Sequence, residues 1–149
     1  WLIILYQNDK KIKEDLKNRA LIDTDILSYY FKGDKNVVRN FENYLDTYEL
    51  IEISIITYYE IFSGLNAKNA LKQLKIFEEF AGENLVLPLT ENSCKISGEI
   101  YSILRYKGEL VDDIDLLIAG VAIENDMVLV TNNEKHFQRI PDLNIENWT

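Results

Sequence analysis

Short apolar runs alternate with longer amphipathic segments along most of the chain, and this alternation limits the possible folds more than any other feature. From Ala20 onward, segments with β-strand character are each followed by one or two segments with helical character. Strands separated in this way by helices usually pair in parallel within one sheet. We therefore predict an α/β fold, in which a central, mostly parallel sheet is flanked by helices.

The individual elements follow from hydrophobic spacing and from turn residues. Predicted strands are residues 20–22, 51–56, 85–89, 127–130 and 143–145, and predicted helices are residues 24–31, 37–48, 57–65, 67–80, 90–106 and a segment around 116–123. The last helix has no polar face, so it is predicted to be buried on most sides. The buried edge predicted for helix 67–80 consists of Leu71, Leu74, Phe77 and Phe80.

The chain length predicts one folded domain. Its 149 residues, 47% of them hydrophobic, supply one core of ordinary size. We place the domain at residues 20–149 and interpret residues 1–19 as an N-terminal extension, for which a disordered or helical arm and an artefact all remain open. The longest apolar run, residues 116–123, is far shorter than the roughly 20 residues that cross a bilayer. Cys94 is the only cysteine, which excludes an internal disulfide and favours a cytoplasmic protein.

The net charge of −9 argues against a protein that holds nucleic acid mainly through a basic face. Acidic residues instead collect after the predicted strands, where open parallel sheets bind ligands. They are Asp23 and Asp25 after the first strand, Glu60 one turn into the helix after the second, Asp112, Asp113 and Asp115 before the buried helix, and the amides Asn132 and Asn133 after strand 127–130. Clustered carboxylates repel one another unless a cation neutralises them, and oxygen ligands suit Mg²⁺ or Mn²⁺.

A purely structural interpretation exists for several of these residues. Thr57 and Glu60 fit a helix-capping box, and Asp112 or Asp113 fits the N-cap of the buried helix, with Asp115 in its first turn. Asp23 is harder to explain in this way, because Thr24 or Asp25 could cap the next helix. Capping and metal binding therefore both remain open for the others.

Three other kinds of functional site are disfavoured by the sequence. His136 is the only histidine, which excludes a two-histidine acid–base pair, and we expect it at the surface. Cys94 has no evident base beside it and is expected to be buried in a helix rather than to act as a nucleophile. The scattered glycines form no phosphate-binding loop.

Four blocks of the sequence resemble the motifs of VapC-type PIN domains. They are residues 20–27 (ALIDTDIL), 55–64 (IITYYEIFSG), 113–119 (DIDLLIA) and 129–137 (LVTNNEKHF), and the resemblance extends from Ala20 to Trp148. It implies a PIN-like fold and Mg²⁺- or Mn²⁺-dependent cleavage of RNA by the toxin of a toxin–antitoxin pair. It also implies a cognate VapB-like antitoxin and a homodimer.

The same resemblance assigns roles to individual residues. Asp23 and Asp115 correspond to the principal metal ligands, and Glu60 completes the carboxylate set. Asn133 occupies the fourth position, where some relatives have aspartate, and supplies a neutral ligand. Asp113 is a candidate to contribute in its place.

Two alternative functions fit parts of the sequence. A haloacid-dehalogenase-like phosphatase would use Asp23 as its nucleophile, since Asp23-Thr24-Asp25 after a strand resembles its motif. However, Leu27 replaces the expected threonine or valine, and the later acidic cluster precedes a helix instead of ending a strand. The other alternative is a catalytically silent PIN-like binding module, in which the carboxylates only cap helices.

Overall fold

The strands form a single parallel sheet of five, in the order β3-β2-β1-β4-β5, in the computed structural model of the protein, which describes residues 19–149. The strands are β1 (Ala20–Ile22), β2 (Glu52–Ser54), β3 (Leu85–Leu87), β4 (Val128–Val130) and β5 (Ile145–Glu146). The helices are α2 (Thr24–Phe31), α3 (Lys35–Leu45), α4 (Ile55–Ala67), α5 (Leu71–Glu83), α6 (Glu91–Lys107), α7 (Asp113–Glu124) and α8 (Glu134–Phe137). This confirms the predicted α/β class.

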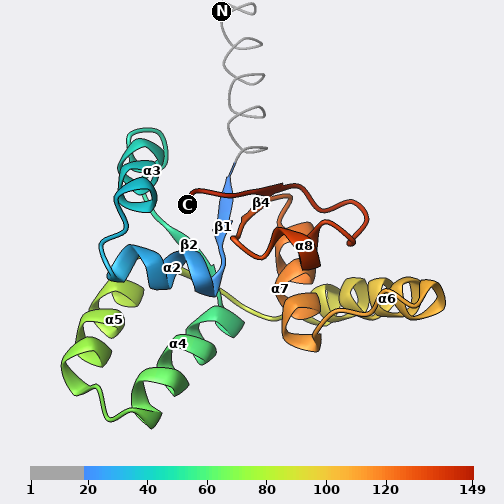
Figure 1. Cartoon of the computed structure of the whole chain (residues 1–149), viewed down its shortest axis with the longest axis horizontal. Helices are drawn as coiled ribbons and strands as arrows, with labels where there is room; N and C mark the ends of the chain where they lie inside the picture. The colour runs from blue at the N-terminus through green and yellow to red at the C-terminus, as the bar shows by residue number, and fades with distance from the viewer. Residues whose placement is uncertain (1–18) are drawn as a thin grey trace, which may run out of the picture.

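The two faces of the sheet are covered by helices from different parts of the chain. Ala20 and Ile22 of β1 pack into the core that α2, α3, α4 and α5 share, whereas Leu21 points to the core beneath α6, α7 and α8. Figure 1 shows these two groups on either side of β1. Because alternate residues of a strand point to opposite faces, a three-residue strand can serve both cores.

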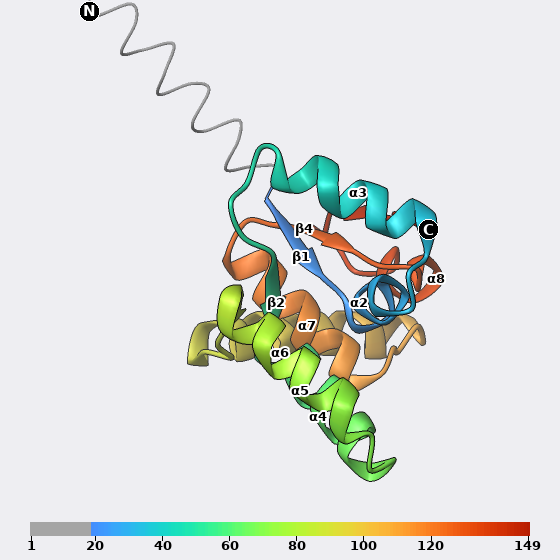
Figure 2. The same cartoon turned by 90° about the vertical axis from the view of Figure 1, so that its left-hand side faces the viewer.

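β1 lies at the centre of the sheet, between β2 and β4. Its pairing with β4 sets Ile22 opposite Val130, and the two strands run side by side in Figure 2. The next residues of the two strands, Asp23 and Thr131, therefore leave the sheet at the same edge. No helix within residues 19–149 is long and apolar enough to cross a membrane.

The proposed boundary near Arg19 falls at the start of the described residues. The Arg19 Nε donates a hydrogen bond to Glu52 Oε2 at 2.9 Å, and the two side chains form an ion pair. Glu52 is buried in β2, so Arg19 neutralises a charge that would otherwise be costly inside the fold. The rest of the predicted extension, residues 1–18, lies outside the described residues.

The structure corrects several sequence predictions. The isoleucine-rich strand predicted for residues 51–56 ends at Ser54, whose side chain caps α4 by accepting a hydrogen bond from Thr57 N. The helix predicted from residue 67 begins at Leu71. Asn69 has a φ of 53°, and a helix cannot continue through that backbone conformation. Leu71 is exposed and not part of the buried edge, and Cys94 is exposed and not buried.

The apolar helix α7 is buried on most sides, as predicted, and it packs closely against α6 at Gly120. A methyl group at Gly120 would meet the Ser97 hydroxyl and would lie 2.5 Å from the Ser93 carbonyl oxygen. That carbonyl belongs to the backbone of α6, so it cannot move aside without displacing the helix. Only glycine fits at this crossing.

Gly120→Ala is therefore expected to lower the free energy of unfolding by about 2 to 3 kcal/mol, because overpacked cores must shift backbone. Gly98→Ala is the matched control, since nothing lies within 4 Å of a methyl group at Gly98. It should leave stability unchanged or raise it by up to about 1 kcal/mol, as expected for alanine in a helix. Chemical denaturation of both variants tests this, and equal destabilisation would contradict the close helix crossing.

Candidate functional site

Asp23 is the most deeply buried carboxylate at the carboxyl edge of the sheet, with only 6% of its surface exposed. One carboxylate oxygen accepts a hydrogen bond from Thr24 N at 2.8 Å, and the other accepts one from the Thr131 hydroxyl at 2.7 Å. Burial and the nearby Asp25 carboxylate raise the pKa of Asp23 to about 7, although these two hydrogen bonds oppose the rise. The two hydrogen bonds thus hold the Asp23 side chain in one orientation, but they offset only part of the cost of its negative charge.

Asp25 lies two residues further along the chain, in the first turn of α2. Its carboxylate accepts hydrogen bonds from Ile26 N at 2.7 Å and from Asn132 N, in the loop after β4, at 3.0 Å. Burial raises the pKa of Asp25, and repulsion from Asp115 adds to the rise. Two strands separated by more than 100 residues of chain therefore hold the same acidic pair.

Asp115 approaches this pair from the first turn of α7. Its Oδ2 atom lies 3.2 Å from His136 Nδ1 and 3.4 Å from Asn133 Nδ2. Burial raises the pKa of Asp115, while the hydrogen bond to His136 lowers it. Asp115 also raises the pKa values of Asp23 and Asp25, so the three carboxylates share one electrostatic environment.

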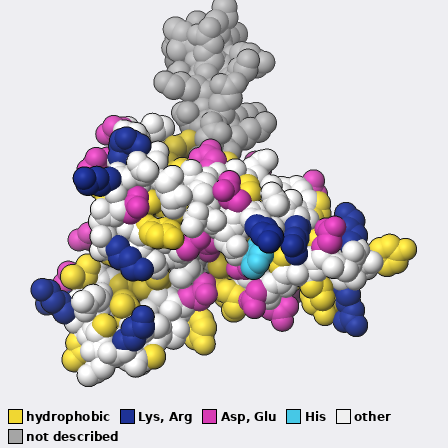
Figure 3. All heavy atoms as spheres, viewed as in Figure 1, with side chains coloured by type: hydrophobic (Ala, Val, Ile, Leu, Met, Phe, Trp, Pro, Cys, Tyr) yellow, Lys and Arg dark blue, Asp and Glu magenta, His cyan; other side chains and the backbone are white. Residues whose placement is uncertain are grey.

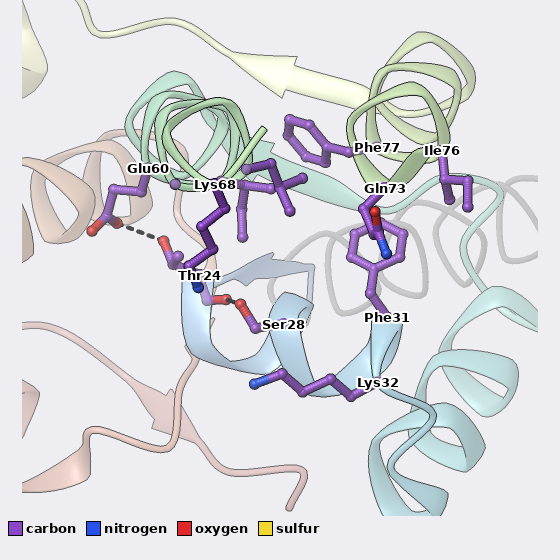
Figure 4. Close-up of a pocket in the computed structure, with 12 residues that line it drawn as sticks. Thr24, Ser28, Phe31, Lys32, Glu60, Lys68, Gln73, Ile76 and Phe77 are labelled. Carbon is purple, nitrogen blue, oxygen red and sulfur yellow. Dashed lines mark hydrogen bonds between the residues drawn. The ribbon is translucent and has the colours of Figure 1, made fainter. Parts of the chain in front are cut away.

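Glu60 joins the site through Thr24. The Thr24 hydroxyl donates a hydrogen bond to Glu60 Oε1 at 2.6 Å and lies 3.2 Å from the Thr57 hydroxyl. The capping-box interpretation of Glu60 is wrong, because Ser54 caps α4 and the Glu60 carboxylate faces α2 instead of its own helix end. Figure 4 shows this contact between α2 and α4.

The structure also shows which residues cap α7 and α2. Asp112 is the N-cap of α7 and accepts a hydrogen bond from Ile114 N at 2.9 Å, which leaves Asp115 free of that duty. Asp23 is itself the N-cap of α2, contrary to the expectation that Thr24 or Asp25 would take that role. Asp113 is exposed, and within residues 19–149 its side chain has no hydrogen bond or ion pair. The structure does not bring it to the other carboxylates.

Three residues of the site were missed by sequence reasoning. Thr24 connects Glu60 to the site, Thr131 holds Asp23, and His136, although exposed as expected, contacts Asp115. The Thr131 contact could have been found by pairing the first strand with strand 127–130, since that register sets residues 23 and 131 side by side. Nothing in the local sequence indicates the other two contacts.

The chemistry of the donors fits a hard divalent cation. Asp23, Asp25 and Asp115 present oxygen atoms only, and their mutual repulsion is relieved by positive charge. Within the described residues, no three acidic, histidine or cysteine side chains are placed so that they alone could hold an ion. Mg²⁺ is commonly held by one or two carboxylates, with water and substrate phosphate completing its shell, so a closed protein cage is not required.

A groove of about 500 Å³ opens beside Glu60, between α2, α4 and α5. Its wall is mostly apolar, with Phe31, Ile61, Leu65, Ile76 and Phe77, and Lys32 and Lys68 lie along it. In Figure 4 the Lys68 side chain extends toward Thr24, at the end of the groove nearest the acidic residues. The groove and the acidic edge therefore form one continuous surface.

Comparison with known proteins shows which family has both this fold and these sequence motifs. The PIN domain family model matches residues 20–143. The chain belongs to the PIN domain family.

Curated relatives place this PIN domain in the VapC group. "Ribonuclease VapC1" of Methanocaldococcus jannaschii is 31% identical over 92% of this chain and 94% of its own length. The "tRNA(fMet)-specific endonuclease VapC" of Salmonella typhimurium is 33% identical over 87% of this chain and 98% of its own length.

Solved structures agree with this assignment of the PIN domain. DNA-bound VapBC from Salmonella typhimurium has a TM-score of 0.80 and 29% identity, covering 89% of this chain and 99% of the solved one. VapBC2 from Rickettsia felis, bound to a DNA fragment from its promoter, has a TM-score of 0.79 and 31% identity, covering 87% of this chain and 98% of the solved one. The comparisons do not favour the phosphatase or the silent binding module.

Proposed function

We propose that this PIN domain is a metal-dependent endoribonuclease and the toxin of a toxin–antitoxin pair. The observation that carries the proposal is a set of three carboxylates at one sheet edge, the buried Asp23 and the half-buried Asp25 and Asp115, in which Asp25 and Asp115 raise the pKa of Asp23 and Asp115 raises that of Asp25. Evolution seldom retains such repulsion without a function, because it lowers stability. The relatives named ribonuclease support RNA as the substrate class.

We assign Asp23, Asp115 and Glu60 to holding Mg²⁺ or Mn²⁺, with Asn133 as a neutral neighbour at the same edge. A bound divalent ion would lower the pKa of a coordinated water and offset the negative charge that develops on the RNA phosphate. The protein contributes rigid positioning: Thr24 N and Thr131 fix Asp23, and the Thr24 hydroxyl fixes Glu60. Such preorganised groups need little rearrangement during the reaction.

Incubation with total RNA and a panel of tRNAs tests the proposal. With Mn²⁺ present, we expect discrete cuts whose ends can be mapped, because an enzyme with a shaped substrate surface cleaves at few positions. The full chain should also slow growth when expressed alone. Absence of cleavage across the panel together with normal growth would contradict the proposed function.

The groove between α2, α4 and α5 is the proposed docking surface for a segment of a VapB-like antitoxin. An amphipathic segment could cover the apolar wall, and an arginine or lysine at its end could reach Glu60 and the acidic edge. A cation there would relieve the same repulsion as a metal ion. Residues of α2, α4 and α5 line the groove, and no residue of α3 does. Homodimer formation stays a prediction, which light scattering of the purified chain would decide.

Ile76→Asp is expected to weaken binding of the cognate antitoxin by about 10- to 100-fold, since it places an unpaired charge in an apolar contact. Leu71→Asp is the matched control on the same helix: Leu71 is 64% exposed and does not line the groove, whereas Ile76 is 47% exposed and does. The antitoxin is identified by its rescue of growth on co-expression, and titration calorimetry measures its affinity. Equal loss in the two variants would rule out this groove as the docking surface.

A further inference from the structure

Three side chains near the acidic edge place their polar atoms unusually close together. Asp115 Oδ2 lies 3.2 Å from His136 Nδ1, the Asn133 amide nitrogen lies 2.9 Å from the same ring nitrogen, and the amide nitrogen and the carboxylate oxygen are 3.4 Å apart. Asp115 comes from α7, whereas Asn133 and His136 lie at the start and within the single turn of α8. The three atoms thus form a triangle between two elements.

With the Asn133 amide in this orientation and His136 neutral, hydrogen bonding leaves one of these contacts unfavourable. If His136 Nδ1 carries a proton, it can donate to Asp115, but it then meets the donor amide of Asn133 at 2.9 Å. If Nδ1 is unprotonated, Asn133 can donate to both neighbours, but the ring lone pair then faces the Asp115 carboxylate at 3.2 Å. Turning the amide removes this conflict in either of two ways: a protonated Nδ1 can donate to both oxygens, or an unprotonated Nδ1 and the two oxygens can bind a cation together.

The size of the triangle matches the spacing of neighbouring metal ligands. In an octahedral shell with bonds of about 2.1 Å, adjacent ligand atoms are about 3.0 Å apart. Rotating the Asn133 amide by 180° exchanges its oxygen and nitrogen and presents three lone pairs to a common point, and the two orientations are equivalent in shape. One carboxylate oxygen, one amide oxygen and one imidazole nitrogen then converge.

The triad is also accessible. The side chains of His136 and Asp115 are 46% and 18% exposed, so an ion can enter and water can complete its shell. In Figure 3 the histidine, drawn in cyan, lies at the surface between basic side chains on one side and acidic side chains on the other. Asp115 is shared with the inner carboxylates, which places this site at the outer side of the proposed catalytic edge.

We infer that Asp115, Asn133 and His136 bind a divalent first-row transition-metal ion such as Mn²⁺ in preference to Mg²⁺, and this rests on the proposed function insofar as Asp115 holds metal. The preference comes from the imidazole nitrogen, which binds transition metals well but is a poor ligand for the hard, strongly hydrated Mg²⁺. His136 therefore extends the ligand set beyond the four motif positions.

Metal binding by the full chain without RNA tests the inference. Mn²⁺ and Mg²⁺ affinities are measured by titration calorimetry at pH 8, so that protons compete less with metal for the ring. Pulsed electron paramagnetic resonance of the Mn²⁺ complex reports whether a nitrogen atom is coordinated. We expect nitrogen coupling in the wild type, its loss in His136→Gln, and Mn²⁺ affinity weakened by about 10- to 100-fold in that variant. Mg²⁺ affinity should change by less than about threefold.

Lys135→Gln is the matched control, since Lys135 is an exposed cation next to His136 in the chain and is not one of the three converging side chains. It should retain the nitrogen coupling and both affinities. Mn²⁺ bound without nitrogen coupling, or equal Mn²⁺ and Mg²⁺ affinities unaffected by His136→Gln, would overturn the inference and leave the ribonuclease proposal intact. No binding of either ion, with or without substrate RNA, would overturn both.

Discussion

Replacing Asp23 by asparagine should reduce RNA cleavage by about 10²- to 10³-fold or more, which is the usual effect of removing one preorganised charged group from an active site. The same change should make the metal-free protein more stable. The folded-state pKa of Asp23 is about 7, above its ordinary 3.8, so the charged form is disfavoured in the folded protein. At pH 8 the buried charge costs of the order of 4 kcal/mol, and asparagine removes it.

Asparagine can keep the local hydrogen bonds of Asp23. Its amide oxygen can accept from Thr24 N, and its amide nitrogen can donate to the Thr131 hydroxyl, which has two lone pairs and accepts one other bond, from Asn133 N at 2.9 Å. We therefore expect a gain of about 1 to 4 kcal/mol at pH 8 and almost none below pH 4, where the aspartate is protonated in both states.

Matched variants distinguish repulsion between the clustered carboxylates from their role as helix N-caps. Asp34→Asn alters the N-cap of α3, whose carboxylate accepts bonds from Asn36 N and Val37 N away from the cluster, so stability and cleavage should stay unchanged. Asp115→Asn and Asp115→Ala should lose cleavage with little loss of stability, because Asp112 caps α7. Asp113→Asn decides whether Asp113 contributes to the site. If the Asp23 and Asp115 variants melt lower in chelator and keep the full Mg²⁺ shift, both carboxylates are structural and our assignment is wrong.

The sequence indicated which acidic residues would lie at the carboxyl edge of the sheet but not how they are connected. Asp23, Glu60 and Asp115 were proposed because each has a fixed distance from a predicted strand or helix. The contact from Thr131 to Asp23 depends on which strands are neighbours, and that order is set by packing of whole helices. The exposed side chain of His136 reaches Asp115 only because α7 and α8 lie together.

The fold was predicted more completely than its details. Alternating apolar runs fix the α/β class, since burial of those runs dominates the free energy of folding. Boundaries depended on single residues: Ser54 ends an isoleucine-rich run that would otherwise continue as a strand, and Asn69 delays α5. The exposure of Leu71 and Cys94 could not be predicted, because it depends on which face of each helix its neighbours leave uncovered.

Removing divalent ions is expected to stop RNA cleavage entirely and to reverse the effect of pH on stability. In chelator, the Asp23 contribution falls as the pH rises from about 4 to about 7, because the folded state binds more protons than the unfolded state across that interval. With Mg²⁺ or Mn²⁺, deprotonation creates the ligand, so metal-induced stabilisation should grow with pH. At 100 times the dissociation constant this stabilisation is about 2.7 kcal/mol, or roughly 5 to 10 °C in Tm.

Thermal melts of the wild type and of Asp23→Asn, in chelator and in Mg²⁺ at several pH values, measure both effects. The difference between the two proteins isolates the Asp23 contribution from that of other titrating groups. Full cleavage in chelator would exclude metal-dependent chemistry, and a metal shift that ignores pH would exclude the carboxylates as its ligands.

The central pairing of β1 with β4 has a consequence for a chain that must not act prematurely. Asp23 and Thr131 are 108 residues apart, and their hydrogen bond exists only once the sheet has closed across that interval. During synthesis, the amino-terminal half emerges first. It contains Asp23 and Glu60 but lacks β4 and its loop. Closing so long a loop comes late in folding, since its entropy cost precedes any gain from contacts. A growing or truncated chain that lacks β4 therefore cannot assemble the acidic edge.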